Sequence, residues 1–386
     1  MKLSLAKLET VLTAIHQTPH QLVLEFAGAG AGALAWLHGV GGSSRTVLEA
    51  TDRYAYPSLV EAIGFQPKQV TSSDVAQALA RGAFKRARNL AGSDTPVIGL
   101  GCTATIATDR AKRGDHRCQV AVCDSQGVQT YSLTMIKGRR NRLEEENLVS
   151  LLILRAIADA VGVAGLPEPD LIGDEVIEVS FEPVAFLRRF VNGDVDWVSI
   201  APDGKLSANK TLPGIAILSG SFNPLHDGHR QLVQVVGEMV GQPIYFELPL
   251  VNADKAPIAL LEARRRSTQF AGYATLIYTR ARLFDEKAAL FPNGIFILGA
   301  DTAERLVQLR FYNDDPAQLD AALNSLKTAG CRIYVAGRLQ GETFLTLKDL
   351  DLPHAYQDLF EEIPPSRFRV DISSSQLRAM RSSTNS

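Results

Sequence analysis

Two histidines lie three residues apart in the segment GSFNPLHDGHRQL, and side chains of this type and spacing can bind a phosphate. The apolar run GIAILS predicts a strand before them, followed by a tight glycine turn and a helix that begins between Asp227 and His229. A helix N-terminus offers free N–H groups and partial positive charge, which together favour an anion. His226 and His229 would lie on its first turn and could donate N–H to the same phosphate oxygens. The alternative for a bare H-x-x-H pair is a helix cap beside a solvated side chain.

The whole segment resembles the G-x-F-x-P-x-H-x-G-H signature of the nucleotidylyltransferase superfamily. Its six fixed positions are matched by Gly220, Phe222, Pro224, His226, Gly228 and His229. A second signature, I-S-[ST]-x-x-[RK] at the start of a late helix, resembles DISSSQLRAM. The residues that match it are Ile372, Ser373, Ser374 and Arg378, and Ser375 leaves the register open. The alternative is an N-capped helix with a solvated arginine, but two signatures in the expected order favour the superfamily.

Three shorter elements, GSFNP, LPLVNADK and ILGADT, resemble those of the nicotinamide or nicotinate mononucleotide adenylyltransferases within this superfamily. The resemblance implies that Asn252 and Lys255 bind the substrate, with Lys255 on a phosphate, and that Asp301 touches a ribose or lies near the adenosine. The residues that it implies for nucleotide binding are Gly220, Ser221, Phe222, Asp301, Ser373, Ser374 and Arg378. Arg338, at the end of RIYVAGR, is a further phosphate candidate by position alone.

The activity implied by the resemblance is transfer of AMP from ATP to a phosphate-bearing acceptor, nicotinamide or nicotinate mononucleotide in NAD biosynthesis, with release of diphosphate. An acceptor phosphate attacks the α-phosphorus in line, so the reaction needs positioning and charge neutralisation rather than a covalent nucleophile. We therefore assign His226 and His229 to transition-state charge. No carboxylate cluster that would hold a metal alone is apparent, so we expect Mg²⁺ to be carried by ATP.

Two other functions stay open at this point. One is adenylyl or cytidylyl transfer to another phosphorylated small molecule, and the other is a non-catalytic nucleotide sensor. Retention of both histidines and Arg378 favours an enzyme over a sensor, because binding alone does not need all three. Phe311 and Tyr312 could stack on a flat ring of the acceptor, although such residues more often belong to the core or its rim.

The amino-terminal half, over residues 6–163, resembles the nicotinamide-mononucleotide deamidase (CinA-like) family with departures. Glu25 and Gly30 keep part of that family's E-S-C-T-G-G motif, but Phe26 replaces the serine that serves as nucleophile and Gly28 replaces the threonine. A phenylalanine cannot attack an amide carbon, so we expect the fold to be kept and the hydrolysis to be lost. This half could bind a pyridine mononucleotide, hold subunits together, or do neither. Other matches to the family are Thr103, Asp109 and the arginines at 139, 140 and 142.

The elements that must position these residues form an alternating pattern, which predicts an α/β fold with two domains. Residues 1–165 are expected to form the CinA-like domain, and 166–213 a connector with short strands. Residues 214–386 are expected to form the nucleotidylyltransferase domain. Its apolar runs GIAILSG, IYFELPLV, GIFILGA and RIYVAGR are typical of a doubly wound, Rossmann-like parallel sheet. Ligands of such a sheet bind at the carboxyl ends of its strands.

Composition restricts the partners and the compartment. The 386 residues are too many for one ordinary core, and a formal net charge of −2 gives no general attraction to nucleic acid or to a membrane. The expected partners are ATP and a small phosphorylated acceptor, and the CinA-like domain could hold a homo-oligomer together. Four cysteines without C-x-x-C spacing, no signal peptide and no apolar span predict a cytoplasmic protein.

Overall fold

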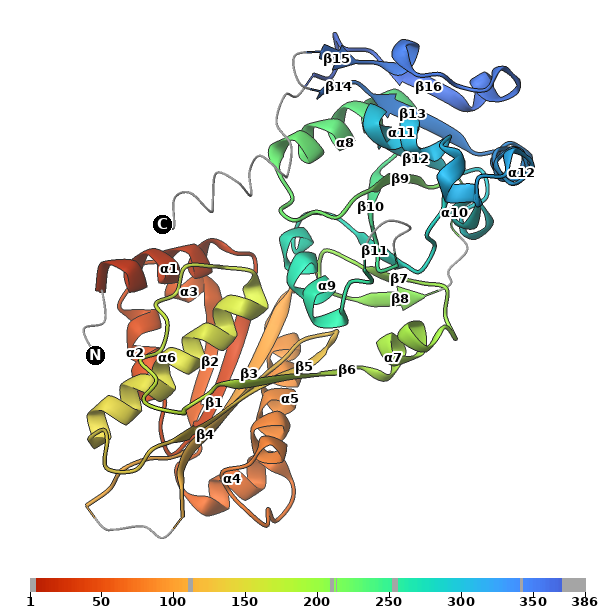
Figure 1. Cartoon of the computed structure of the whole chain (residues 1–386). Coiled ribbons are helices and arrows are strands. Elements are labelled where there is room, and N and C mark those ends of the chain that lie inside the picture. The colour runs from red at the N-terminus through yellow and green to blue at the C-terminus, as the bar shows by residue number, and fades with distance from the viewer. Residues whose placement is uncertain are drawn as a thin grey trace. The chain divides into compact units, whose positions relative to one another are not determined.

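The computed structural model describes residues 5–109, 114–208, 212, 214–251, 256–340 and 343–369, and it divides the chain into two compact units (Figure 1). Unit 1 comprises Met1–Arg189, Ala201–Leu206 and Ser267–Tyr273. Unit 2 comprises Phe190–Ile200, Ser207–Arg266 and Ala274–Ser386. Both units are α/β, as predicted. The stretch that the sequence separates as a connector contributes strands to both sheets, because β6 pairs with β5 in unit 1 and β7 pairs with β11 in unit 2.

Unit 1 contains a six-stranded sheet in the order β2-β1-β3-β4-β5-β6. The first three strands of this order are parallel, and β4, β5 and β6 each run antiparallel to the preceding neighbour. The strands are β1 (Gln21–Ala27), β2 (Val47–Asp52), β3 (Val97–Thr105), β4 (His116–Cys123), β5 (Gly127–Met135) and β6 (Glu178–Pro183). The helices are α1 (Leu5–Gln17), α2 (Ala31–His38), α3 (Ser43–Thr46), α4 (Tyr56–Ile63), α5 (Ser73–Leu90) and α6 (Arg142–Val161).

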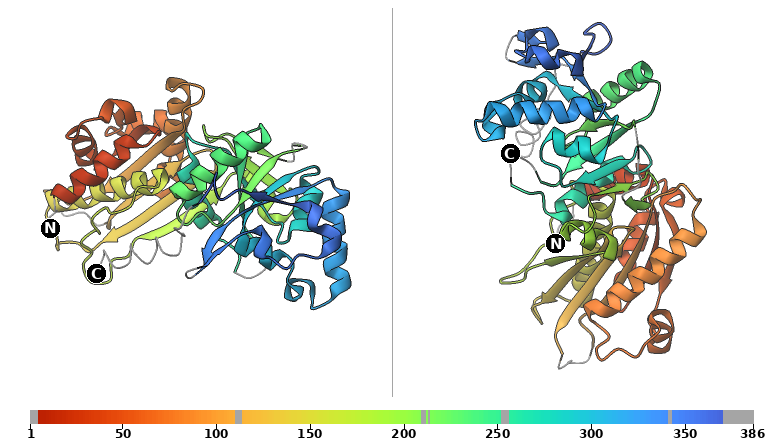
Figure 2. Two further views of the ribbon diagram at one scale, coloured as in Figure 1. Left: turned by 90° about the horizontal axis from the view of Figure 1, so that it is seen from above. Right: turned by 90° about the vertical axis from the view of Figure 1, so that its right-hand side faces the viewer.

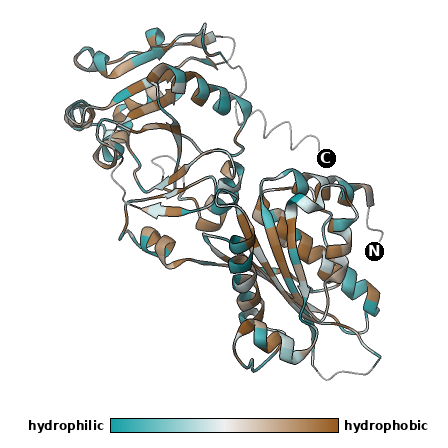
Figure 3. Cartoon of the chain, turned by 180° about the vertical axis from the view of Figure 1, so that it is seen from behind, coloured by the Kyte–Doolittle hydropathy of each residue, from teal (hydrophilic) through white to brown (hydrophobic). Residues whose placement is uncertain are grey.

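Helices cover both faces of this sheet, since successive residues of β1 point to opposite sides. Leu22 and Leu24 pack in one cluster with residues of α1, α2 and α6, whereas Val23 packs with Ala83 and Ala87 of α5. Helices α1, α2 and α6 accordingly cover one face of the sheet and α5 the other (Figure 1 and Figure 2). The central strands are mostly hydrophobic along their length, as Figure 3 shows.

Two glycines let α5 lie unusually close to β3. A Cβ atom at Gly99 would lie 2.0 Å from the backbone nitrogen of Phe84, and one at Gly101 would lie 2.2 Å from the carbonyl oxygen of Ala76. Any side chain at either position would push the helix away from the sheet. Ser72 caps the same helix by accepting a hydrogen bond from the Val75 N–H at 3.4 Å.

Unit 2 contains an eight-stranded sheet in the order β16-β13-β12-β9-β10-β11-β7-β8. Its strands are β7 (Trp197–Ile200), β8 (Leu206–Ala208), β9 (Ala216–Ser219), β10 (Ile244–Pro249), β11 (Leu276–Thr279), β12 (Ile295–Gly299), β13 (Arg332–Ala336) and β16 (Phe360–Ile363). The hairpin β14 (Arg338–Gln340) and β15 (Thr343–Leu345) follows β13. The helices are α8 (Asp227–Val240), α9 (Leu260–Ser267), α10 (Phe284–Leu290), α11 (Ala300–Leu306) and α12 (Pro316–Thr328), while α7 (Ala185–Asn192) has residues in both units. Short 3₁₀ helices of unit 2 lie at Leu309–Tyr312, Leu347–Asp349 and His354–Leu359, and the one at Thr268–Phe270 belongs to unit 1.

The six strands from β16 to β11 are parallel and have the order of a doubly wound fold. Strand β9 lies between β10 and β12, so the winding reverses on its two sides (Figure 1). In open sheets of this kind the crevice at the carboxyl end of the reversal point is where ligands bind. The segment that carries the two histidines leaves β9 at this point. None of the described helices combines the length and hydropathy that a membrane span requires.

Candidate functional site

The turn between β9 and α8 has the form that the sequence predicts. Strand β9 ends at Ser219, and α8 begins at Asp227 with His226 as its N-cap residue. The Gly220 N–H donates to the carbonyl of Glu247 in β10 at 3.0 Å. Phe222 then folds back with a φ of 43° and is almost fully buried. A Cβ atom at Gly220 would lie 2.7 Å from the Phe222 ring, so glycine is needed here for packing.

The two imidazoles are stacked on each other at the start of α8. Their ring centroids are 3.7 Å apart with an interplanar angle of 26°. The backbone N–H of His226 donates to Nδ1 of His229 at 3.2 Å, so in the neutral imidazole of His229 the proton lies on Nε2. The edge of Phe222 packs against His229 with centroids 5.2 Å apart. The two rings are therefore held in a defined orientation, and the tautomer of His229 is fixed.

Burial above all, followed by the nearby His226 and Arg338, lowers the pKa of His229 from 6.5 to about 3. Burial also lowers the pKa of His226. His229 is consequently neutral at pH 7, and it can offer an Nε2–H dipole rather than a positive charge to a ligand. The structure thus refines the sequence interpretation, in which the protonation state was left open.

Arg338 and Asp301 supply the charged groups near this turn. Arg338 follows β13, Asp301 lies in the first turn of α11 after β12, and the guanidinium donates to Asp301 Oδ2 at 2.6 Å. Arg338 is close enough to His226 and His229 to lower the pKa of both. His226 Nδ1 and Asp301 Oδ1 are buried, and neither has a hydrogen-bond partner among the described residues. Buried polar atoms of this kind are usually satisfied, so the arrangement fits a ligand that supplies partners.

A buried network that the sequence did not reveal lies under the start of the turn. Glu247 of β10 accepts hydrogen bonds from Ser219 of β9, from Thr279 of β11 at 2.5 Å and from Lys287 of α10 at 2.6 Å. The Lys287 and Glu247 side chains are 4% and 0% exposed. The one available signal was a glutamate inside the apolar run IYFELPLV.

Two arginines of helix α9 contact Ser221 and Asn223 of the β9–α8 turn. Arg266 donates to the Ser221 carbonyl at 3.0 Å, and Arg265 donates to Asn223 Oδ1 at 3.1 Å. Glu262 binds both guanidiniums, at 2.6 and 2.7 Å. Hydrogen bonds from Arg265 above all lower the pKa of Glu262 to about 2. Sequence reasoning missed this contact because 42 residues separate Asn223 from Arg265.

The structure therefore brings five predicted residues together in one turn, and it places Asp301 and Arg338 beside them. The five are Gly220, Ser221, Phe222, His226 and His229. The other predicted residues, Asn252, Lys255, Ser373, Ser374 and Arg378, lie outside the described part of the chain.

Tyr312 is not available for stacking on a ligand. Its side chain is buried, its hydroxyl donates to the Leu306 carbonyl at 2.9 Å, and burial raises its pKa to about 12. It is a core residue, so the stacking hypothesis was wrong for this position. The ring of Phe311 packs under the guanidinium of Arg310, 4.7 Å from its centroid.

In unit 1, the position that the sequence resemblance assigns to a deamidase nucleophile is filled by a buried side chain. Phe26 is buried in β1, where it belongs to the core. Glu146 of α6 accepts the Gly30 N–H at 2.9 Å and the Gly32 N–H at 3.1 Å, so a carboxylate occupies the N-terminus of α2. Burial, followed by the negative charge of Glu146, raises the pKa of Asp52. The place where an anionic ligand would bind already holds negative charge from the chain itself.

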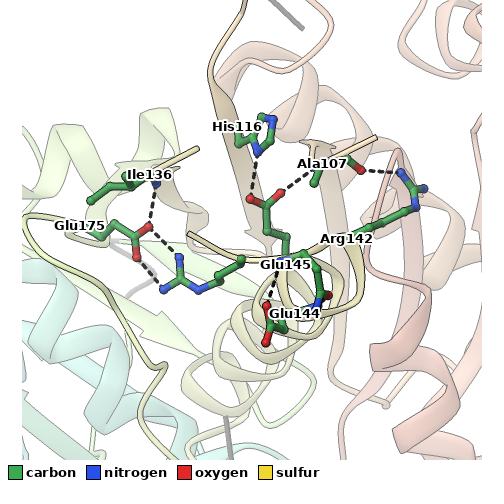
Figure 4. A network of polar contacts seen from close by, with 9 residues as sticks. Ala107, His116, Ile136, Arg142, Glu144, Glu145 and Glu175 are labelled. Carbon is green, nitrogen blue, oxygen red and sulfur yellow. Dashed lines mark hydrogen bonds and ion pairs between the residues drawn. The ribbon is translucent and has the colours of Figure 1, made fainter. Parts of the chain in front are cut away.

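The retained polar residues of unit 1 are engaged in internal contacts (Figure 4). Glu145, fully buried, accepts the Ala107 N–H at 2.7 Å and lies 2.8 Å from Nδ1 of His116. Arg142 donates to the Ala107 carbonyl at 3.0 Å, and Arg140 pairs with Glu175 at 2.7 Å.

Thr103 is also occupied, because its buried hydroxyl donates to the Val70 carbonyl at 3.0 Å. These contacts account for Thr103, Arg140 and Arg142 by hydrogen bonding and ion pairing within the unit.

Part of the chain is similar to solved structures of CinA competence/damage-inducible proteins. CihA from Agrobacterium tumefaciens matches with 17% identity and a TM-score of 0.32, over 39% of this chain and 92% of that chain. A CinA superfamily protein from Escherichia coli matches with 15% identity and a TM-score of 0.30, over 41% and 91%. One from Klebsiella pneumoniae matches with 14% identity and a TM-score of 0.29, over 40% and 94%. No protein-family model and no curated protein sequence matches the chain.

Proposed function

We propose that unit 2 is a nucleotidylyltransferase that transfers AMP from ATP to nicotinamide or nicotinate mononucleotide, with release of diphosphate. The observation that carries the proposal is the stacked pair of His226 and His229. It lies at the N-terminus of α8, where the strand order reverses, and its hydrogen bond leaves the Nε2 proton of His229 directed away from the helix backbone. The resemblance of this turn to the superfamily signature gives the reaction class.

In the proposed reaction a phosphate oxygen of the acceptor attacks the α-phosphorus of ATP. The new phosphorus–oxygen bond forms as the bond to the bridging oxygen of the β-phosphate breaks, and diphosphate leaves with that electron pair. The N–H groups of α8 and the imidazole N–H donors would stabilise the charge that develops on the transferred phosphoryl group. Arg338 would neutralise part of the charge of the triphosphate.

The proposed metal is Mg²⁺ carried by the triphosphate, where it would neutralise the charge of the phosphates. Within the described residues, no group of three His, Cys, Asp or Glu side chains could hold a metal ion by itself.

For unit 1 we propose a structural role without amide hydrolysis. The buried Phe26 and the carboxylate of Glu146 at the N-terminus of α2 support this, since neither a nucleophile nor an anion site is presented there. A cytoplasmic location and a homo-oligomer formed through unit 1 stay predictions.

The test is an end-point assay of the full chain with MgATP and a panel of acceptors. The panel contains nicotinamide mononucleotide, nicotinate mononucleotide and phosphopantetheine, and a parallel series replaces ATP with CTP. We expect diphosphate and a dinucleotide only with ATP and a pyridine mononucleotide. A different acceptor or CTP would replace the proposed substrate, and nucleotide binding without diphosphate release would favour the sensor.

A further inference from the structure

The ion pair between Lys287 and Glu247 is buried directly beneath the β9–α8 turn. Its Nζ and Oε2 atoms are 2.6 Å apart, and the two side chains are almost wholly removed from water. Moving two charges out of water costs several kcal/mol each, and a hydrophobic pair of similar volume is often as stable. A contribution to stability alone is therefore a weak reason for such a pair.

The Glu247 carboxylate joins three strands at the point where the turn begins. Its Oε2 accepts from the hydroxyl of Ser219, the last residue of β9, and its Oε1 accepts from Thr279 of β11. Lys287 donates to the same Oε2 and also to Ser219 Oγ at 3.1 Å. The main-chain carbonyl of Glu247 accepts the N–H of Gly220. One residue thus fixes the end of the strand and the first residue of the turn.

Aromatic packing connects the Glu247 network with the histidine pair. Phe246, next to Glu247 in β10, packs edge-on against Phe222 with centroids 5.3 Å apart. Phe222 in turn packs edge-on against His229. A shift of the turn would move Phe222 and with it the imidazole. The two charges of the pair cancel, so its effect on a nearby ligand is through position rather than through net charge.

We propose that Glu247 and Lys287 are positioning residues that hold the β9–α8 turn and thereby orient the imidazole of His229 toward the phosphoryl group. This inference rests on the proposed function for the identity of the ligand. The geometry of the turn itself can be tested without any ligand.

Two double variants of the full chain separate position from charge. Glu247→Leu with Lys287→Met removes the ion pair without leaving a buried charge, and it also removes the hydrogen-bond acceptor for Ser219 and Thr279. Glu247→Gln with Lys287→Met removes the charges but keeps an acceptor oxygen. The matched control is Lys327→Met with Asp358→Leu, which removes an exposed ion pair of the same unit.

The first readout is amide hydrogen exchange of residues 220–229 without nucleotide, with the tautomer of His229 followed by ¹⁵N NMR. In the Leu/Met variant we expect exchange in this segment to rise tenfold or more and the His229 tautomer to become mixed. The Gln/Met variant should keep most of the protection, and the control all of it. Unchanged exchange in the Leu/Met variant, or equal loss of protection throughout unit 2 in both variants, would overturn the proposal.

The second readout is diphosphate release. We expect kcat of the Leu/Met variant to fall by on the order of 10²-fold with a much smaller change in the KM for ATP, because about 1 Å of misplacement has that effect. The Gln/Met variant should recover most of kcat. A parent chain with no activity would reject the proposed function, while hydrogen exchange would still decide the positioning role. Full kcat in the Leu/Met variant would contradict positioning.

Discussion

The N-termini of α2 in unit 1 and α8 in unit 2 are built from the same parts. Each helix follows a parallel strand of its sheet through a short turn that contains glycine. At α2 the Gly30 and Gly32 N–H groups donate to Glu146, so an internal carboxylate satisfies them. At α8 the helix start carries two stacked imidazoles, and Nδ1 of His226 is left without a hydrogen-bond partner among the described residues. The N-terminus of α2 is thus satisfied by a side chain of its own unit, whereas the N-terminus of α8 is a candidate ligand site.

The charged side chains near the two helix N-termini also differ. The carboxyl groups of Asp52 and Glu146 lie near the start of α2, whereas near the start of α8 the carboxylates of Asp227 and Asp301 are accompanied by the guanidinium of Arg338. An incoming phosphate would be repelled in the first case, whereas in the second the guanidinium of Arg338 offers it a positively charged partner. The helix dipole alone does not decide whether such an end binds an anion, because a single nearby side chain can satisfy or oppose it.

Removal of the imidazole of His229 is the variant with the largest expected effect on the α8 site. His229→Ala should lower kcat by on the order of 10²-fold or more while the affinity for ATP changes much less, because the contact would strengthen in the transition state. Steady-state kinetics with isothermal titration of ATP would measure both quantities. His354→Ala, at an exposed histidine of the same unit, is the control. Activity near that of the parent would remove the histidine pair from the mechanism.

Arg338→Gln should weaken the attraction of the α8 site for the triphosphate. Loss of one hydrogen bond to a charged group costs about 1.5–3 kcal/mol, so the KM for ATP should rise roughly tenfold or more while that for the acceptor changes little. The pKa of His229 should also rise, because the guanidinium now lowers it. NMR titration of the imidazole checks the second effect. A change in melting temperature without a change in KM would assign Arg338 to structure.

Protonation offers a smaller and independent test. The pKa of His229 is about 3 in the folded chain and near 6.5 when unfolded, so below pH 6.5 the unfolded state takes up a proton that the folded state does not. The free energy of unfolding should therefore fall by about 1–2 kcal/mol between pH 7 and pH 5 on account of this residue. Urea unfolding at both pH values measures the change. His229→Ala should show a shallower pH dependence than the parent, and an identical slope would contradict the buried neutral state.

Glu146→Ala would open the start of α2. Two backbone N–H groups lose their acceptor, so the free energy of unfolding should fall by about 1–2 kcal/mol without loss of transferase activity. Denaturant unfolding measures this, with Glu168→Ala as a control at an exposed ion pair of the same unit. A stability equal to that of the parent would show that water replaces the carboxylate without cost.

The last prediction is the absence of an activity, amide hydrolysis by unit 1. The intact chain should release no ammonia from nicotinamide mononucleotide, because the sequence resemblance sets Phe26 at the position of the nucleophile and the Thr103 hydroxyl donates a hydrogen bond to the Val70 carbonyl. Robust release that is abolished by substitution of Thr103 or Tyr54 would show that another group has taken over the hydrolysis.

Local features of this chain could be predicted from sequence, and long-range ones could not. The strand, turn and helix around His226 follow from neighbouring residues. The bonds of Glu247 to Lys287 and of Glu146 to Gly30 connect residues 40 and 116 positions apart, and only the folded sheet brings them together. Tyr312 shows the same limit, since the burial of an aromatic residue after a helix depends on what packs over it.

Two ion pairs of unit 2 differ in their contact with solvent, and salt should therefore separate them. Arg338 and Asp301 are 44% and 40% exposed, while Lys287 and Glu247 are almost wholly buried. At an ionic strength of about 1 M the Debye length is roughly 3 Å, which screens exposed charges but reaches buried ones much less. Concentrated salt should weaken the hold on a phosphate while the turn that presents the histidines keeps its shape. Inhibition by salt would then disappear at once on dilution, with no refolding step.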